Sequence, residues 1–118
     1  MVFVIEQWQL REQYVSQALE LMQKMDEIVG PSAHTDSGWC EHGRFFQLHE
    51  RPHEIWMMYR WRSRPEHEVY IAGEERLLRD FYDEYCASPR KMLYFTELPV
   101  DVDVAEITGD GKHVWPDE

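Results

Sequence analysis

The 118-residue chain has the length of one modest domain, and its apolar residues, 43% of the total, suffice for a hydrophobic core. Its formal net charge of −11 argues against nucleic acid and membrane surfaces as partners, because the field of the chain repels phosphate. No apolar run approaches the ~20 residues of a spanning helix, and the first residues lack the features of a signal peptide. The two cysteines form no CxxC pair, so we expect a reduced, cytoplasmic protein.

The first part of the chain predicts a strand and then a long helix. Residues 2–9, VFVIEQWQ, are rich in β-branched and aromatic side chains, which favours a strand. From Leu10 to Val29 the apolar residues recur every three or four positions, which is one face of an amphipathic helix. Gly30-Pro31 is expected to end this helix, and a polar loop follows.

The middle of the chain predicts a hairpin followed by a second helix. Residues 44–50 and 54–62 are expected to be the two strands of the hairpin, joined by the turn RPH. Ser63 has the spacing of a helix N-cap, with a proline in the first turn and Glu66 three residues later. The helix is then expected to run to about Cys86.

The last part of the chain predicts a fourth strand and an extension. The tripeptide SPR is expected to break the second helix, and residues 91–98, KMLYFTEL, favour a strand. We expect the domain to comprise residues 1–100 and an acidic C-terminal extension to comprise residues 101–118. The apolar residues of the extension predict that it packs on its own subunit or across a dimer; these are Ile107, Val114 and Trp115.

The predicted order of elements is β-α-β-β-α-β. This is the ferredoxin-like arrangement of the α+β class, a four-stranded antiparallel sheet with both helices on one face.

The hairpin contains a zinc-hydrolase pattern, His49-Glu50-Arg51-Pro52-His53. On a helix, histidines four residues apart share a face and hold one metal ion. Pro52 would break a helix interior, and the flanking residues alternate as strands do. We therefore expect two surface histidines at a turn and no metal site there.

Both faces of the predicted sheet carry large apolar groups. In the third strand, alternation places one set of side chains on one face (Ile55, Met57, Tyr59, Trp61) and the other set on the opposite face (Trp56, Met58, Arg60, Arg62), and the two helices cover only one of these faces. An uncovered apolar face of this size rarely stays in water, so we expect a homodimer that packs sheet against sheet. We also expect a cavity, between sheet and helices or between the sheets, for a small apolar or aromatic ligand.

At this point the chain resembles the dimeric α+β barrel superfamily, and within it the antibiotic biosynthesis monooxygenase-like family. The resemblance covers roughly residues 2–98. It is carried by the order of elements and by the junction YRWRSRPEHEVYIAGEE of residues 59–75, where a third strand ends in Trp61 and runs into a helix that opens with acidic residues.

The resemblance implies oxygenation of an electron-rich aromatic substrate, such as an anthrone-like polyketide, without a cofactor. The substrate is deprotonated, and its anion gives an electron to O2. Trp61 matches the tryptophan of the family. The family often has a histidine about nine residues later, where this chain has Tyr70, with His67 one helical turn earlier. The haem-degrading relatives use an asparagine, and this chain has none.

These considerations give a set of candidate residues with two interpretations each. His67, Tyr70 and Trp61 are the candidates for catalysis; the alternatives are a solvated histidine, a packed tyrosine and a core tryptophan. The candidates for substrate binding are Gln7, Tyr59, Arg60 and Tyr94. Arg60 is alternatively an ion-pair partner of Glu97 or Glu6, and the acidic pair at 74–75 is expected to be a solvated helix face.

Three classes of function stay open from the sequence. The first is a cofactor-free monooxygenase for a small aromatic substrate. The second is a small-ligand binder without catalytic activity, and the third is an isomerase or cyclase that acts by proton transfer. The two enzyme classes require a titratable group that lines the cavity, and the binder does not.

Overall fold

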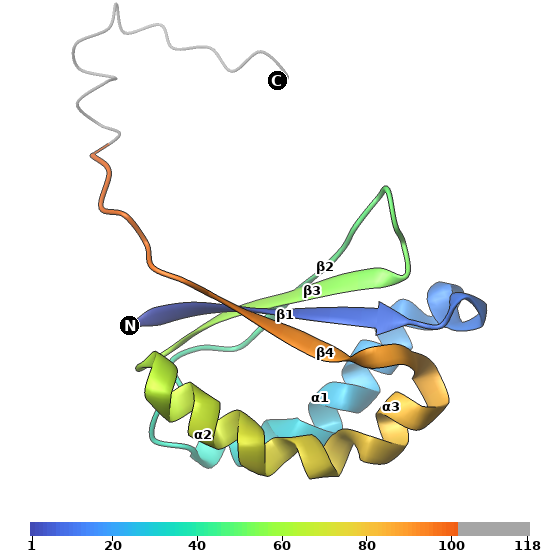
Figure 1. Ribbon diagram of the computed structural model, residues 1–118, viewed down its shortest axis with the longest axis horizontal. Helices are drawn as coiled ribbons and strands as arrows, with labels where there is room; N and C mark the ends of the chain where they lie inside the picture. Colours follow the sequence, from blue (N-terminus) through green and yellow to red (C-terminus); the bar gives the residue numbers. More distant parts are fainter. Residues whose placement is uncertain (102–118) are drawn as a thin grey trace, which may run out of the picture.

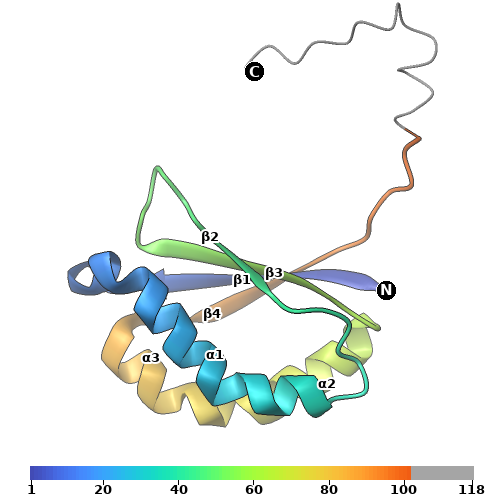
Figure 2. The same ribbon diagram turned by 180° about the vertical axis from the view of Figure 1, so that it is seen from behind.

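A computed structural model describes residues 1–101, and its sheet and helices form two layers. The strands are β1 (Val2–Leu10), β2 (Arg44–Gln47), β3 (Glu54–Trp61) and β4 (Cys86–Phe95). They make one antiparallel sheet in the order β2-β3-β1-β4. The helices α1 (Ala18–Thr35), α2 (Arg64–Glu74) and α3 (Arg79–Tyr85) all lie on one side of it (Figures 1 and 2). The predicted ferredoxin-like α+β fold is confirmed.

Short 3-10 segments join these elements. One, Glu12–Gln17, precedes α1, and the other, Glu75–Leu78, joins α2 to α3 so that the predicted second helix is in two parts. Ser63 is the N-cap of α2: its hydroxyl accepts the backbone N–H of Glu66 at 3.3 Å and donates to the Glu66 carboxylate at 2.8 Å. The predicted N-cap is therefore confirmed. No helix within residues 1–101 is long and apolar enough to cross a membrane.

Two prolines lie inside elements of regular structure. The expectation that Gly30-Pro31 ends the first helix is wrong, whereas α3 does end at Tyr85, before the tripeptide SPR. Helix α1 continues through Pro31 to Thr35, although a proline has no N–H for the helical hydrogen bond. The buried residues Val29 and Gly30 hold this part of the helix against the rest of the domain, so tertiary packing outweighs the local preference.

Pro89 lies within β4, which begins at Cys86 rather than at residue 91. The strand is at the edge of the sheet, where a missing backbone donor is tolerated. The pairing of Lys91 with Gln7 and of Ser88 with Gln9 leaves two residues of β4 opposite one of β1, which is a β-bulge. The two residues of the bulge are Pro89 and Arg90, and the side chain of Arg90 is buried.

Register assigns each strand residue to one of the two faces. Tyr59 pairs with Val4, and Val4 pairs with Tyr94, so these three side chains share the face that the helices cover. The buried core lies on this face and includes Trp8, Leu10, Met25, Leu78 and Trp61. The opposite, open face carries apolar side chains on all four strands (Phe3, Ile5, Phe46, Trp56, Met58, Leu93 and Phe95). The expected alternation of β3 is confirmed.

The turn between β2 and β3 holds the zinc-hydrolase pattern. Residues 49–53 form bends and a turn rather than a helix, as expected from Pro52. Within residues 1–101, no group of three or more His, Cys, Asp or Glu side chains converges as metal ligands would. The expected packing of the C-terminal extension concerns residues 102–118, which lie outside the described part of the chain.

Candidate functional site

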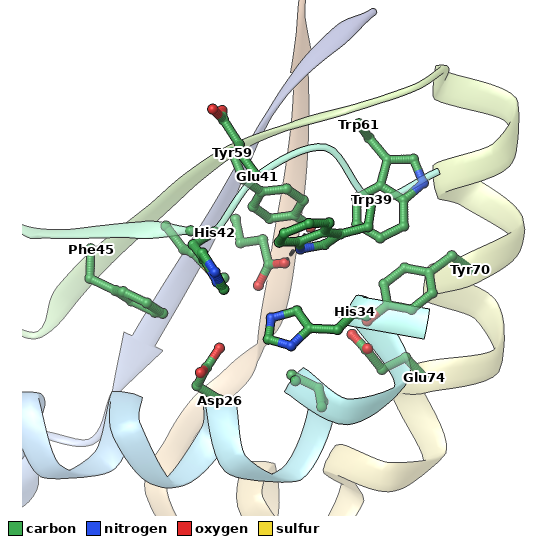
Figure 3. Close-up of a pocket in the computed structure, with 16 residues that line it drawn as sticks. Asp26, His34, Trp39, Glu41, His42, Phe45, Tyr59, Trp61, Tyr70 and Glu74 are labelled. Carbon is green, nitrogen blue, oxygen red and sulfur yellow. Dashed lines mark hydrogen bonds between the residues drawn. The ribbon is translucent and has the colours of Figure 1, made fainter. Parts of the chain in front are cut away.

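A cavity of about 80 Å³ lies between the sheet and α1, next to the segment that joins α1 to β2. Strands β1 and β3 form one wall, and α1 and α2 form the opposite wall (Figure 3). Residues 39–43 of the joining segment pass along one side and contribute Trp39 and His42. A cavity is therefore present on the helix side of the sheet, one of the two places where the sequence predicts one; that it binds a ligand stays a prediction.

Three of the sequence-predicted site residues meet on this cavity. Tyr59 and Trp61 come from β3 and Tyr70 from α2, and all three line the cavity. The rings of Trp61 and Tyr70 stack with their centroids 4.7 Å apart, and the rings of Tyr59 and Trp61 are edge-on at 5.9 Å. Aromatic rings in these orientations attract one another, so together they make an aromatic wall. What each residue does there stays a prediction.

Gly38 fixes the position of Trp61 from outside the cavity. A Cβ atom at Gly38 would lie 2.2 Å from the indole Nε1 of Trp61, which is closer than any side chain allows. The backbone of Gly38 also accepts the N–H of Arg62 at 2.8 Å. The Nε1 atom is buried and has no hydrogen-bond partner among the described residues. The close approach of the glycine backbone thus leaves room for the ring but gives it no acceptor.

His67 is fully buried, so the expectation of a solvated first-turn histidine is wrong. It does not line the cavity but lies behind Tyr59, whose hydroxyl is 2.6 Å from its Nε2 atom. Its Nδ1 atom is 2.8 Å from the hydroxyl of Tyr94. Burial lowers the pKa of His67 to about 4, so the imidazole is neutral at pH 7. Helix α2 turns this residue inward because it lies on the buried stripe of the helix.

The other predicted binding residues lie away from the cavity. Gln7 pairs with Trp56 and Arg60 pairs with Phe3, so both side chains belong to the open face. Arg60 forms its ion pair with Glu41 at 2.9 Å rather than with Glu6 or Glu97. Tyr94 lies on the helix side, half-buried, and bonds to His67 without lining the cavity. A ligand in the cavity would therefore contact neither Gln7 nor Arg60.

Two buried carboxylates line the inner end of the site, and a buried arginine behind them binds both. Glu6 on β1 and Glu74 at the end of α2 both line the cavity and are 3% and 2% exposed. Arg90 on β4 donates to both at 2.9 Å and also to Glu75 at 2.8 Å. The expectation that residues 74–75 form a solvated helix face is therefore wrong. Buried charges of this kind are retained when they are paired and hydrogen-bonded.

The environment of Glu74 changes its acidity. Burial raises the pKa of the Glu74 carboxyl to about 7, against the opposite effect of the charge and hydrogen bond of Arg90. Ser32 on α1 also donates to this carboxyl at 3.2 Å. A carboxyl with a pKa near neutrality can accept a proton from a substrate and release it again at pH 7. Glu74 is thus one titratable group of the kind that an enzyme would require in this cavity.

A second set of aromatic side chains closes the other side of the cavity. The rings of His34, Trp39 and His42 are mutually edge-on, with centroids 5.0 to 5.1 Å apart. His34 comes from the last turn of α1 and the other two from the joining segment, and all three face the cavity (Figure 3).

Of these additional residues, only Glu6 could have been identified from the sequence. Glu6 occupies the inward parity of β1, between Val4 and Trp8, which predicts a buried carboxylate. Glu74, Arg90 and His34 carry no such signal, because their positions depend on how α1, α2 and β4 pack together. His34 also falls in the helix beyond Pro31 that the sequence did not predict.

Comparisons with known proteins were made on sequence and on structure. The sequence matches no protein-family model and no curated protein sequence. Solved structures do resemble it. A crystal structure named antibiotic biosynthesis monooxygenase has a TM-score of 0.60 at 16% identity, over 84% of this chain and 100% of that one.

Two further structures are named "putative antibiotic biosynthesis monooxygenase". The protein from Bordetella bronchiseptica has a TM-score of 0.63 at 12% identity, over 82% of this chain and 96% of its own. The protein from Nitrosomonas europaea has a TM-score of 0.58 at 14% identity, over 83% of this chain and 99% of its own. At these identities the likeness concerns the fold. The chain therefore has the α+β fold of the antibiotic biosynthesis monooxygenase-like proteins that its sequence resembles.

Proposed function

We propose that the protein is a cofactor-independent monooxygenase for a small, electron-rich aromatic substrate that binds between the sheet and the helices. One observation carries the proposal: a buried carboxyl with a pKa of about 7, Glu74, lines a cavity that is walled by the rings of Tyr59, Trp61 and Tyr70. The likeness in fold to proteins named for this activity supports it. A binder needs the rings alone, whereas an oxygenase needs a proton acceptor as well.

The reaction follows from the chemistry of such a substrate. An anthrone-like ring system carries an acidic CH2 group, and Glu74 accepts one proton from it to leave a carbanion. The carbanion gives one electron to O2, and the resulting radical pair combines to a peroxide. Glu74 returns its proton to the peroxide anion, and the hydroperoxide then loses its remaining C–H proton and a hydroxide ion, so that the CH2 group becomes a carbonyl. One oxygen atom enters the product, and the other leaves as water with the two protons.

The described cavity is smaller than such a substrate. An apolar cavity of ~150 Å3 takes one benzene molecule, whereas this one measures about 80 Å³. The side of the cavity without a helix or strand of its own is the segment of residues 36–43, which is joined to the sheet by the bridge between Trp39 and Trp61. We propose that Trp39 and His42 swing outward with this segment when the substrate binds. Closure of the same segment then shields the carbanion from water.

The test is oxygen consumption by metal-free protein over a panel of anthrones and hydroquinones. Glu74→Gln keeps the shape of the side chain and removes its basicity, so turnover should fall about 100-fold or more. Trp61→Ala should mainly weaken binding. Glu68→Gln, on the exposed side of α2, is the matched control and should leave turnover unchanged. If ligands bind but none is turned over above the buffer rate, the oxygenase proposal fails and a ligand-binding function replaces it.

We also propose that two copies pair through the open face of the sheet. Phe46 and Phe95 are 44% and 47% exposed there, and Phe3, Trp56 and Met58 extend the same apolar surface. Burying apolar surface stabilises by ~25 cal/mol per Å2 before the costs of association. Arg60 and Gln7 would then lie at the interface between the copies rather than at the substrate.

A further inference from the structure

A continuous chain of hydrogen bonds connects the cavity to the edge strand of the sheet. The hydroxyl of Tyr59 donates to Glu6 Oε2 at 2.6 Å. The same hydroxyl is 2.6 Å from His67 Nε2, and His67 Nδ1 is 2.8 Å from the hydroxyl of Tyr94. The four groups come from β1, β3, α2 and β4, so the chain crosses the whole core beside the cavity.

One arrangement of hydrogens satisfies all three bonds. Since Tyr59 gives its only proton to Glu6, its oxygen must accept from His67, which places the imidazole proton on Nε2. The Nδ1 atom then has no proton and accepts the hydroxyl proton of Tyr94. Every donor points the same way, from Tyr94 toward Glu6. A neutral imidazole in this tautomer can pass a proton from one nitrogen to the other.

The two ends of the chain differ in their surroundings. Glu6 and Tyr59 line the cavity, whereas His67 and Tyr94 do not. Tyr94 is half-buried on the edge strand β4, and the guanidinium of Arg64, an exposed residue, lies 4.5 Å above its ring. Glu6 is 3% exposed and lines the cavity, so a substrate ring there would cover its one accessible side. The hydrogen-bonded chain would then be the remaining connection between that carboxylate and solvent.

We propose that Tyr94, His67 and Tyr59 form a proton relay between solvent and Glu6. In the inward direction, Tyr94 takes a proton from water and gives its own to His67 Nδ1. His67 gives its Nε2 proton to Tyr59, and Tyr59 gives its proton to Glu6, which becomes a carboxylic acid. Each group gains one proton and loses one, and no electrons are exchanged; the outward direction is the reverse. The relay rests on the proposed function, since it serves a cavity in which substrate protons move.

The experiment measures the exchange of the His67 Nε2 proton with solvent, which requires no turnover. In protein with 15N-labelled histidine, the His67 signal at pH 7 should show a proton on Nε2 and none on Nδ1. The rate of exchange is then compared in wild type, in Tyr94→Phe and in Tyr85→Phe. The last is a matched control, because the hydroxyl of Tyr85 bonds to Lys24 at the surface, outside the relay.

The expected result separates a relay from a structural hydrogen bond. If Tyr94 passes protons to His67, Tyr94→Phe should slow the exchange by about tenfold or more, and Tyr85→Phe should leave it unchanged. If Tyr94 only holds His67 in place, its loss loosens the packing and the exchange becomes faster. Faster or unchanged exchange in Tyr94→Phe overturns the relay, as does a proton on Nδ1.

A second variant covers the case in which Tyr94→Phe disturbs the fold. Arg64→Gln changes the surroundings of the Tyr94 ring and leaves the hydroxyl of Tyr94 in place, so exchange should stay within about twofold of wild type. The Trp61 indole signal reports the fold of each variant. Slowed exchange without oxygen consumption keeps the relay and removes the oxygenase proposal. Oxygen consumption by wild type together with unchanged exchange in Tyr94→Phe keeps the oxygenase proposal and removes the relay.

Discussion

The buried groups Glu74 and His67 should impose opposite pH dependences on the free energy of unfolding. Measuring the two dependences separately, in variants of each residue, tests whether both groups are buried as described. Burial raises the pKa of Glu74 from 4.5 to about 7 and lowers that of His67 from 6.5 to about 4. Between pH 4.5 and 7 the folded state holds one proton more at Glu74 than the unfolded state does. Between pH 4 and 6.5 it holds one proton fewer at His67.

The signs follow from proton linkage. Stability falls as pH rises when the folded state binds the additional proton, so Glu74 makes the protein less stable from pH 4.5 to 7. His67 makes it more stable from pH 4 to 6.5, because the imidazole must lose its proton to be buried. One proton corresponds to ~1.4 kcal/mol per pH unit, or about 3 kcal/mol over each window. In wild type the two contributions cancel between pH 4.5 and 6.5.

The measurement is urea unfolding at half-unit steps of pH and at one fixed protein concentration. Compared with wild type, Glu74→Gln should gain stability with rising pH, and His67→Gln should lose it, each by ~1.4 kcal/mol per unit between pH 4.5 and 6.5. Glu68→Gln, at an exposed position on the same helix, should follow wild type. The reasoning is refuted if both buried variants keep the wild-type slope, because the two groups would then titrate as they do in the unfolded chain.

Three further predictions concern other parts of the molecule. Gly38→Ala should lower the free energy of unfolding by ~1–3 kcal/mol, measured by urea unfolding, because its methyl group would strike the indole of Trp61; an unchanged midpoint would contradict this contact. Light scattering should report about twice the 14.3 kDa chain mass, and Met58→Glu on the open face should return the mass to that of one chain; a soluble wild-type monomer would exclude the proposed pairing. Metal analysis of untagged protein grown with zinc should find no stoichiometric zinc, whereas one zinc per chain that disappears in His49→Ala would reveal a site at the turn of residues 49–53.

Alternation along the strands predicted which strand residues of the site share one face of the sheet. Tyr59 and Trp61 share the helix side of β3 because side chains two residues apart always share a face. Gln7 and Arg60 have the opposite parity, and the same rule places them on the open face. The sequence did not decide between the two faces as the place of the ligand, which is why residues from both were candidates.

The charged part of the site depends on contacts between distant elements. Glu74 resembles a surface residue in sequence because it stands next to Glu75 near the end of a polar helix. Its partner Arg90 lies in a bulged strand, after a 3-10 segment and a second short helix, and local patterns predict neither the bulge nor the break in the helix. The same holds for His67, whose two tyrosine partners lie on different strands. Burial changes the acidity of such groups only after packing is complete.

The two edges of the sheet bear on how the protein avoids self-assembly into ribbons. An edge strand presents unpaired N–H and C=O groups that can join those of another molecule. On one side, β2 is only four residues long, which leaves little to extend. On the other side, β4 has ten residues, but Pro89 removes one donor, Lys91 places a charge on the strand and the bulge distorts its line. Pro89, predicted from the sequence as a helix breaker, therefore has a second effect. It keeps the longest free edge of the sheet from acting as a template for aggregation.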